Sequence, residues 1–151
     1  MKLQWILSAS LSLSRSWILF RWLRSRSNRV IAFSADTPSN EIHEYFMRLA
    51  LKQAEAASRV NEVPIGAVVV QNLTTASDES QIYRVVAERH NRVERLHDAT
   101  AHAELLALRQ AGNRQGNWRL INTTLYSTLE PCPMCLAAAQ ASRVQSIVYG
   151  A

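Results

Sequence analysis

The chain has 151 residues, 48% of them hydrophobic and 19% charged, which is typical of a globular domain and excludes a disordered or collagen-like chain. Its length is sufficient for one domain with a sizeable core. The net charge of +5 is concentrated at the N-terminus, because residues 1–35 carry six of the 17 basic residues and no acidic residue. The rest of the chain is nearly neutral, so the basic balance does not by itself identify a nucleic-acid-binding surface.

Residues 1–35 combine arginine and serine with bulky apolar side chains, a composition typical of an organellar transit peptide. We therefore expect a mitochondrial or plastid protein, with the cytoplasm as the alternative, and we exclude residues 1–35 from the fold as a disordered leader. A secretory signal competes with this interpretation, because Lys2 precedes an apolar stretch. Serines dilute that stretch, and the body shows no cysteine pattern suited to secretion. Arg15 and Arg21 interrupt it as well, so no membrane span is expected.

The folded body is expected to span residues 36–151. A helix is predicted from Glu41 to about Ser58, because aromatic and aliphatic residues recur there at helical spacing. A short apolar run at 65–70 is typical of a buried strand, and a polar loop at 71–80 separates it from a second strand at about 81–88. Four arginines in and after this strand indicate either phosphate contacts or a solvated face: Arg84, Arg89, Arg92 and Arg95.

The second half of the body alternates predicted helices and strands. A helix over 102–111 is expected to stop at Gly112, and a strand over 120–129 follows. An alanine-rich helix over 132–141 and a last strand over 146–149 complete the pattern. This order of elements predicts an α/β protein with a mixed sheet and helices on its faces.

Two short motifs carry residues suited to chemistry: His102-Ala103-Glu104 and Pro131-Cys132-Pro133-Met134-Cys135. Imidazole and thiolate are ligands that zinc prefers, and a catalytic zinc site has three protein ligands and one open position. We predict His102, Cys132 and Cys135 as the metal ligands and Glu104 as the catalytic proton carrier. Together the two motifs match the H-x-E and P-C-x-x-C signature of zinc-dependent nucleobase deaminases.

Other interpretations of the cysteine pair are a redox couple and half of a structural zinc site. A redox couple does not need the H-x-E motif. A structural site needs a fourth ligand, for which the chain offers His43, His90 and His97. The presence of Glu104 beside His102 favours a catalytic site.

From Asn61 to Ala151 the sequence resembles the TadA-type tRNA adenosine deaminases of the cytidine deaminase superfamily. The resemblance rests on five runs of residues: 61–68, 97–104, 107–109, 124–132 and 142–144. The zinc motif alone indicates only the superfamily. The Thr128-Leu129-Glu130-Pro131-Cys132 run and the Ser142-Arg143 pair favour the tRNA branch over guanine deaminases.

This resemblance implies a three-layer α/β/α cytidine deaminase-like fold and a homodimer with one Zn²⁺ per subunit. It implies hydrolytic deamination of the wobble adenosine, position 34, in a tRNA anticodon loop, with Asn91 as a hydrogen-bond partner of the flipped nucleoside. Two alternatives stay open. One is a free nucleobase or nucleoside deaminase acting on guanine or cytosine, and the other is a catalytically silent zinc-bearing partner subunit.

The sequence departs from the family pattern at several positions. Ala99 stands where proline is usual, Ala138 replaces a usual glycine, and the polar segment 71–80 is longer than the typical bacterial hairpin. The family normally continues beyond Gly150-Ala151 with another strand and a helix. We therefore expect the deaminase domain, 36–151, to be truncated at its C-terminus.

Overall fold

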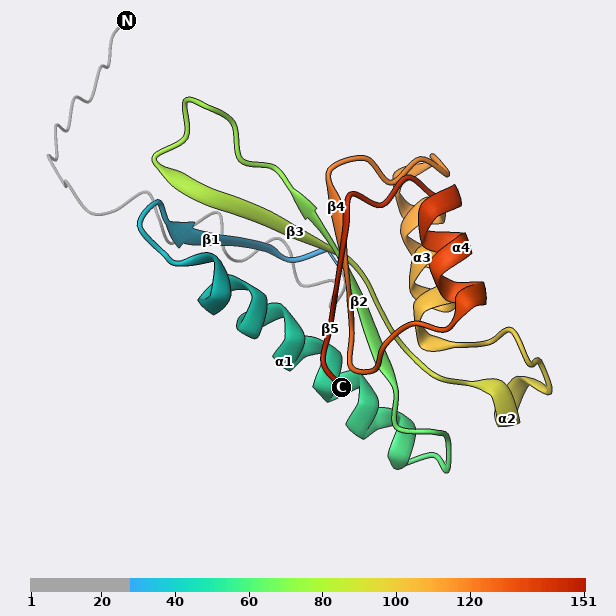
Figure 1. Cartoon of the computed structure of the whole chain (residues 1–151). Coiled ribbons are helices and arrows are strands. Elements are labelled where there is room, and N and C mark those ends of the chain that lie inside the picture. The colour runs from blue at the N-terminus through green and yellow to red at the C-terminus, as the bar shows by residue number, and fades with distance from the viewer. Residues whose placement is uncertain (1–27) are drawn as a thin grey trace, which may run out of the picture.

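A computed structural model describes residues 28–151, so most of the predicted leader lies outside the described residues. Five strands form one mixed sheet in the order β1-β3-β2-β4-β5, with helices on both faces (Figure 1). Neighbouring strands are antiparallel except for the parallel pair β4 and β5. The strands are β1 (Val30–Ser34), β2 (Gly66–Asn72), β3 (Ser80–His90), β4 (Thr123–Ser127) and β5 (Ser146–Tyr149). The predicted three-layer α/β fold with a mixed sheet is confirmed.

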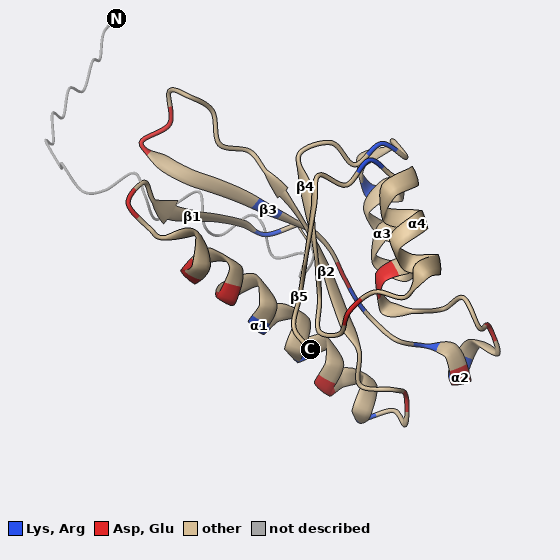
Figure 2. Cartoon of the chain, viewed as in Figure 1, with Lys and Arg blue, Asp and Glu red and all other residues tan. Residues whose placement is uncertain are grey.

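Helix α1 (Ser39–Ser58) covers one face of the sheet because its apolar residues form a single stripe. Ile42, Phe46 and Leu49 pack there against a cluster that includes Val68 and Tyr126. The outer side of α1 carries interspersed acidic and basic residues (Figure 2). Within residues 28–151, no helix is both long and apolar enough to cross a bilayer.

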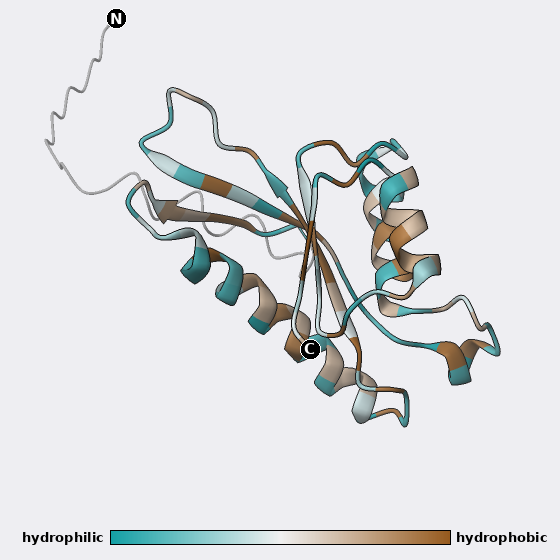
Figure 3. Ribbon diagram, in the orientation of Figure 1, coloured by the Kyte–Doolittle hydropathy of each residue, from teal (hydrophilic) through white to brown (hydrophobic). Residues whose placement is uncertain are grey.

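Helices α3 (Ala103–Gln115) and α4 (Pro133–Ala141) cover the opposite face of the sheet. Their small residues allow close packing, and Ala107 and Ala139 lie in one buried cluster with Val69 and Leu125 of the central strands. Figure 3 shows hydrophobic residues concentrated in these strands and in α4. Both faces of β2 are thereby buried, which explains its continuous apolar sequence.

Gly66 marks the closest approach of α1 to the sheet. A Cβ atom at this position would lie 2.0 Å from the backbone oxygen of Ala50 and 2.5 Å from the backbone nitrogen of Ala54. No side chain fits in this space, so glycine lets the first layer sit directly on the start of β2. The backbone of Gly66 also exchanges hydrogen bonds with Thr128, where the chain leaves β4.

Two boundaries differ from the sequence-based prediction. Residues 30–34 were expected in the leader, but they form the edge strand β1, paired with β3 from Val30 opposite Arg84 to Ser34 opposite Ser80. This strand belongs to the fold because Ile31 and Phe33 pack against the core beneath α1. The second difference is that Gly112 lies inside α3, which ends instead at Gly116 with a left-handed φ of 61°.

Candidate metal centre

Two helix N-termini meet at one end of the sheet. His102 is the N-cap of α3, and its carbonyl oxygen accepts the first hydrogen bond of the helix from the N–H of Leu106. Cys132 is the N-cap of α4, where Pro133 occupies the first helical position and the N–H of Leu136 closes the first turn. Because the cap positions start the helices, the predicted ligands lie together where the two helices begin.

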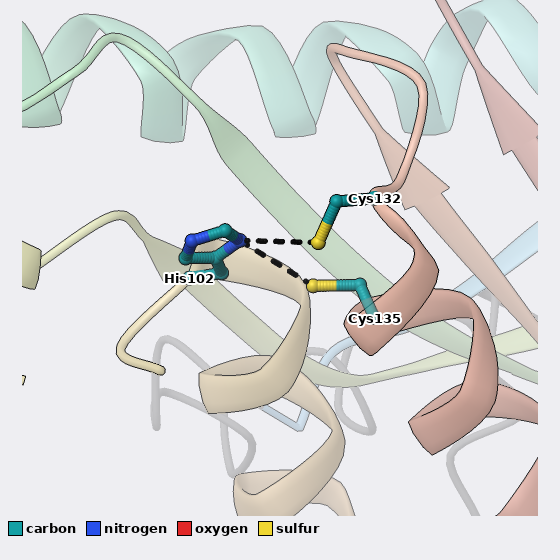
Figure 4. Close-up of side chains that lie close together, drawn as sticks. All are labelled: His102, Cys132 and Cys135. Atoms are coloured by element: carbon teal, nitrogen blue, oxygen red, sulfur yellow. Dashed lines mark hydrogen bonds between the residues drawn. The ribbon is translucent and has the colours of Figure 1, made fainter. Parts of the chain in front are cut away.

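The three predicted ligand side chains converge in the structure (Figure 4). Nδ1 of His102 lies 3.6 Å from Sγ of Cys132 and 3.6 Å from Sγ of Cys135. A tetrahedral zinc with ordinary bond lengths would place its nitrogen and sulfur ligands about 3.6 Å apart. The distances in the structure therefore fit a zinc ion held by these three atoms.

The electrostatics of the cysteines also fit a bound cation. Cys135 is buried, and this burial, with the nearby negative charge of Glu104, raises the pKa of its thiol. A thiol in such surroundings stays protonated unless a positive charge is close by. A divalent metal supplies that charge and deprotonates the thiols that bind it.

Glu104 lies in the first turn of α3, two residues after His102. Its side chain is 3% exposed, and its Oε2 atom has no hydrogen-bond partner in the described part of the chain. A buried carboxylate oxygen without a partner is costly for a folded protein, so its retention requires an explanation. A water or substrate atom in the open position of the metal site would satisfy it.

The other histidines do not complete a closed four-ligand site. Among the described residues, the one group able to hold a metal consists of His102, Cys132 and Cys135, with ligand atoms within 4.8 Å of one another. His43 lies on α1, across the sheet, where its Nδ1 is 2.9 Å from the hydroxyl of Tyr126. Three ligands and one open position are the arrangement of a catalytic zinc site.

Asn91 follows β3 and is 3% exposed. Its backbone N–H donates to the carbonyl of Ile65, and the N–H of the next residue, Arg92, donates to the carbonyl of Ala101. Since Ala101 directly precedes His102, these bonds hold the segment of Asn91 beside the start of α3. The structure thus brings Asn91 to the end of the sheet at which the metal-binding residues lie.

Glu62 is a residue that sequence reasoning did not single out. Its carboxylate accepts hydrogen bonds from Nδ2 of Asn91 at 3.2 Å and from the backbone N–H groups of Glu94 at 3.3 Å and Arg95 at 2.8 Å. Burial acts to raise the pKa of this carboxyl, but the donated hydrogen bonds outweigh it and lower the pKa. Glu62 therefore stays ionised and fixes both Asn91 and α2 (Val93–Leu96), a short helix that was not predicted.

The four arginines considered together in the sequence do not form one cluster. Arg84 precedes His90 by six strand residues, which places it about 20 Å from the end of β3. Arg89 points to Gln110 on α3, whose side-chain oxygen accepts from its guanidinium at 2.7 Å. The prediction of a single basic patch beside the catalytic residues is therefore wrong for Arg84, because a strand extends so far along the chain.

Comparison with known proteins gives one family. Residues 40–151 match the model of the cytidine and deoxycytidylate deaminase zinc-binding region. The chain is 41% identical over 120 residues to the chloroplastic tRNA(adenine(34)) deaminase of Arabidopsis thaliana, covering 80% of this chain and 8% of that protein. It is 39% identical over 113 residues to a tRNA-specific adenosine deaminase of Streptococcus pyogenes, covering 75% of this chain and 65% of that protein.

Solved structures resemble the fold at similar levels. A structure from work on A-to-I editing by tRNA:A34 deaminases is 42% identical with a TM-score of 0.62, covering 72% of this chain and 75% of that one. The guanine deaminase of Bacillus subtilis is 35% identical with a TM-score of 0.62, covering 72% and 64% of the two chains. The chain thus spans less than two thirds of several of its relatives.

Proposed function

Because the chain belongs to the cytidine and deoxycytidylate deaminase family, we propose that it is a zinc-dependent hydrolase that converts the wobble adenosine of a tRNA to inosine. The observation that carries the proposal is the trio of His102, Cys132 and Cys135 at zinc-ligand distances beside the buried carboxylate of Glu104. The names of the relatives at 39% and 41% identity support tRNA adenosine 34 as the substrate.

The ligands in this proposal are Nδ1 of His102 and the thiolates of Cys132 and Cys135, which hold one zinc ion per subunit. When bound there, zinc acts as a Lewis acid that makes a water molecule easy to deprotonate near neutral pH. Glu104 accepts that proton and passes protons to the adenine ring nitrogen and to the leaving amine. The adenosine and one water become inosine and ammonia.

Asn91 is proposed to hydrogen-bond the nucleoside, with Glu62 as a positioning residue. The bond from Asn91 Nδ2 to Glu62 fixes the orientation of the side-chain amide. A base inside a duplex cannot reach such a buried carboxylate, so the substrate base must be unpaired or flipped. An anticodon loop meets this requirement at low energetic cost.

Two further features of the proposal concern the whole protein. We propose a homodimer, as the family resemblance implies. We also propose that the basic segment before β1 is a leader for a plastid or mitochondrion, which the chloroplastic relative supports. A fluorescent fusion of residues 1–35 tests the leader, and a cytoplasmic signal would contradict it.

The proposed function is tested by measuring inosine at the wobble adenosine of an arginine tRNA anticodon stem-loop, with the zinc-loaded full chain. The Glu104→Gln variant is expected to lose about 10²- to 10⁴-fold in rate, because it cannot carry the proton. Glu41→Gln removes the same charge from the exposed side of α1 and is the matched control. It should retain the parent rate.

A different outcome would favour the second candidate. The guanine deaminase structure matches the fold as well as the tRNA deaminase structure does, with the same TM-score of 0.62. Ammonia release from free guanine, with no inosine in any RNA, would assign the site to a free base. No activity on either substrate by folded, zinc-loaded protein would favour the silent partner subunit.

A further inference from the structure

A second cavity lies at the opposite end of α3 from the metal centre. It has a volume of about 730 Å³ and is lined by Arg84, Arg114 and Arg119, together with four amide side chains and two aliphatic ones, and no carboxylate. Figure 2 shows basic positions at this C-terminal end of α3. The cavity is about 17 Å from the first residue of α3, since each helical residue adds 1.5 Å. It is therefore separate from the zinc site.

Two hydrogen-bond donors in this cavity have no acceptor. Nε of Arg84 and Nε2 of Gln115 are buried and lack a partner in the described part of the chain. Buried donors in folded proteins are nearly always satisfied, by protein, water or ligand. Both atoms can only donate, so a ligand that satisfies them must offer acceptor oxygens.

The surrounding charges favour an anion. Glu88 is the acidic residue whose charge acts on Arg114, and Arg29 already pairs with it at 2.6 Å. Arg119 lies over the ring of Trp118, with its guanidinium carbon 4.0 Å from the ring centroid. Arg84 and Arg119 form no ion pair within residues 28–151. Their positive charge is thus available to a ligand.

The chain itself offers no obvious occupant. Residues 1–27 contain basic residues and no acid, so the leader does not complement a cavity lined by arginine. Arginine together with asparagine and glutamine amides is the set of side chains that most often contacts phosphate oxygens. A volume of several hundred Å³ is sufficient for a phosphate-bearing group.

We propose that this cavity, at Arg84, Gln115 and Arg119, is a phosphate-binding site distinct from the deaminase centre. The shared chemistry is a phosphate group, which can belong to the backbone of an RNA or to a free phosphate compound. The proposal does not depend on which reaction the zinc site performs.

The test uses the zinc-loaded full chain and the double variant Arg84→Gln/Arg119→Gln. Binding of inorganic phosphate is measured by calorimetry, and binding of an anticodon stem-loop RNA by fluorescence anisotropy over a range of salt concentrations. Arg48→Gln is the matched control, because Arg48 is an exposed arginine on the other face of the sheet. Arg119→Gln alone is a second variant at an exposed position, which keeps the test valid if replacing Arg84 impairs folding.

The double variant is expected to lower phosphate affinity about tenfold or more, the effect of losing charge-assisted hydrogen bonds. If an RNA phosphate is the ligand, RNA affinity falls too, and its salt slope decreases by about 0.7 for each lost contact. Loss of phosphate binding with unchanged RNA affinity would assign the site to a free phosphate compound. Phosphate and RNA affinities equal to those of Arg48→Gln would overturn the proposal, whether or not inosine is formed.

Discussion

Replacing Gly66 by alanine tests how closely α1 sits on the sheet. The new Cβ would lie 2.0 Å from the Ala50 oxygen, whereas ordinary contact begins at 3.4 Å. The helix and strand must therefore separate by about 1 Å or more, and both contacts at 2.5 Å or less are with backbone atoms that no rotamer change can move. We expect a loss of about 3 kcal/mol in the free energy of unfolding, at the upper end of the usual cost of overpacking.

The assay is guanidinium unfolding followed by circular dichroism, with a thermal scan beside it. For a domain of this size, about 3 kcal/mol corresponds to a fall in Tm of roughly 12 °C. Gly112→Ala is the matched control, because its Cβ would meet nothing closer than 3.5 Å and alanine favours the interior of α3. The control should gain up to about 1 kcal/mol. A Gly66→Ala protein within about 1 kcal/mol of the parent would refute the reasoning.

Three further outcomes are expected. Cys132→Ser should reduce bound zinc below one ion per chain after dialysis against a chelator, measured by mass spectrometry, and an unchanged zinc content would remove Cys132 from the ligand set. Glu62→Gln should lower kcat/KM about tenfold with zinc retained, because its amide would face the donors of Asn91 and of Glu94; parent kinetics would show that Asn91 needs no fixing. Burial and the charge of Arg92 lower the pKa of His90 from 6.5, so the unfolded chain binds more protons just below pH 6.5. The free energy of unfolding should therefore fall as the pH drops below 6.5, and His90→Gln should reduce this slope; an equal slope would contradict the assignment.

The metal centre and the phosphate-binding cavity lie at opposite ends of one helix. His102 and Glu104 occupy the first turn of α3, and Arg114 and Gln115 occupy its last turn. A substrate that engaged both ends would have to extend about 17 Å along the helix. An RNA hairpin reaches that far, whereas a free base does not, so the phosphate test also bears on the choice of substrate.

The sequence determined the chemistry of the site because that information is local. The H-x-E and P-C-x-x-C motifs each occupy a few consecutive residues, and each supplies its own helix cap. Apolar spacing in the chain likewise predicted α1, β2 and β5. The three ligands follow from residue type and spacing alone.

Only the tertiary structure decided which distant residues support the site. Glu62 reaches Asn91 across 29 positions of sequence, and no periodic pattern encodes that bond. The edge strand β1 is recognised only by its pairing with β3, since its sequence also suits a leader. Arg84 is close in sequence to Asn91 but remote in space, because an extended strand separates residues that a compact loop would have kept together.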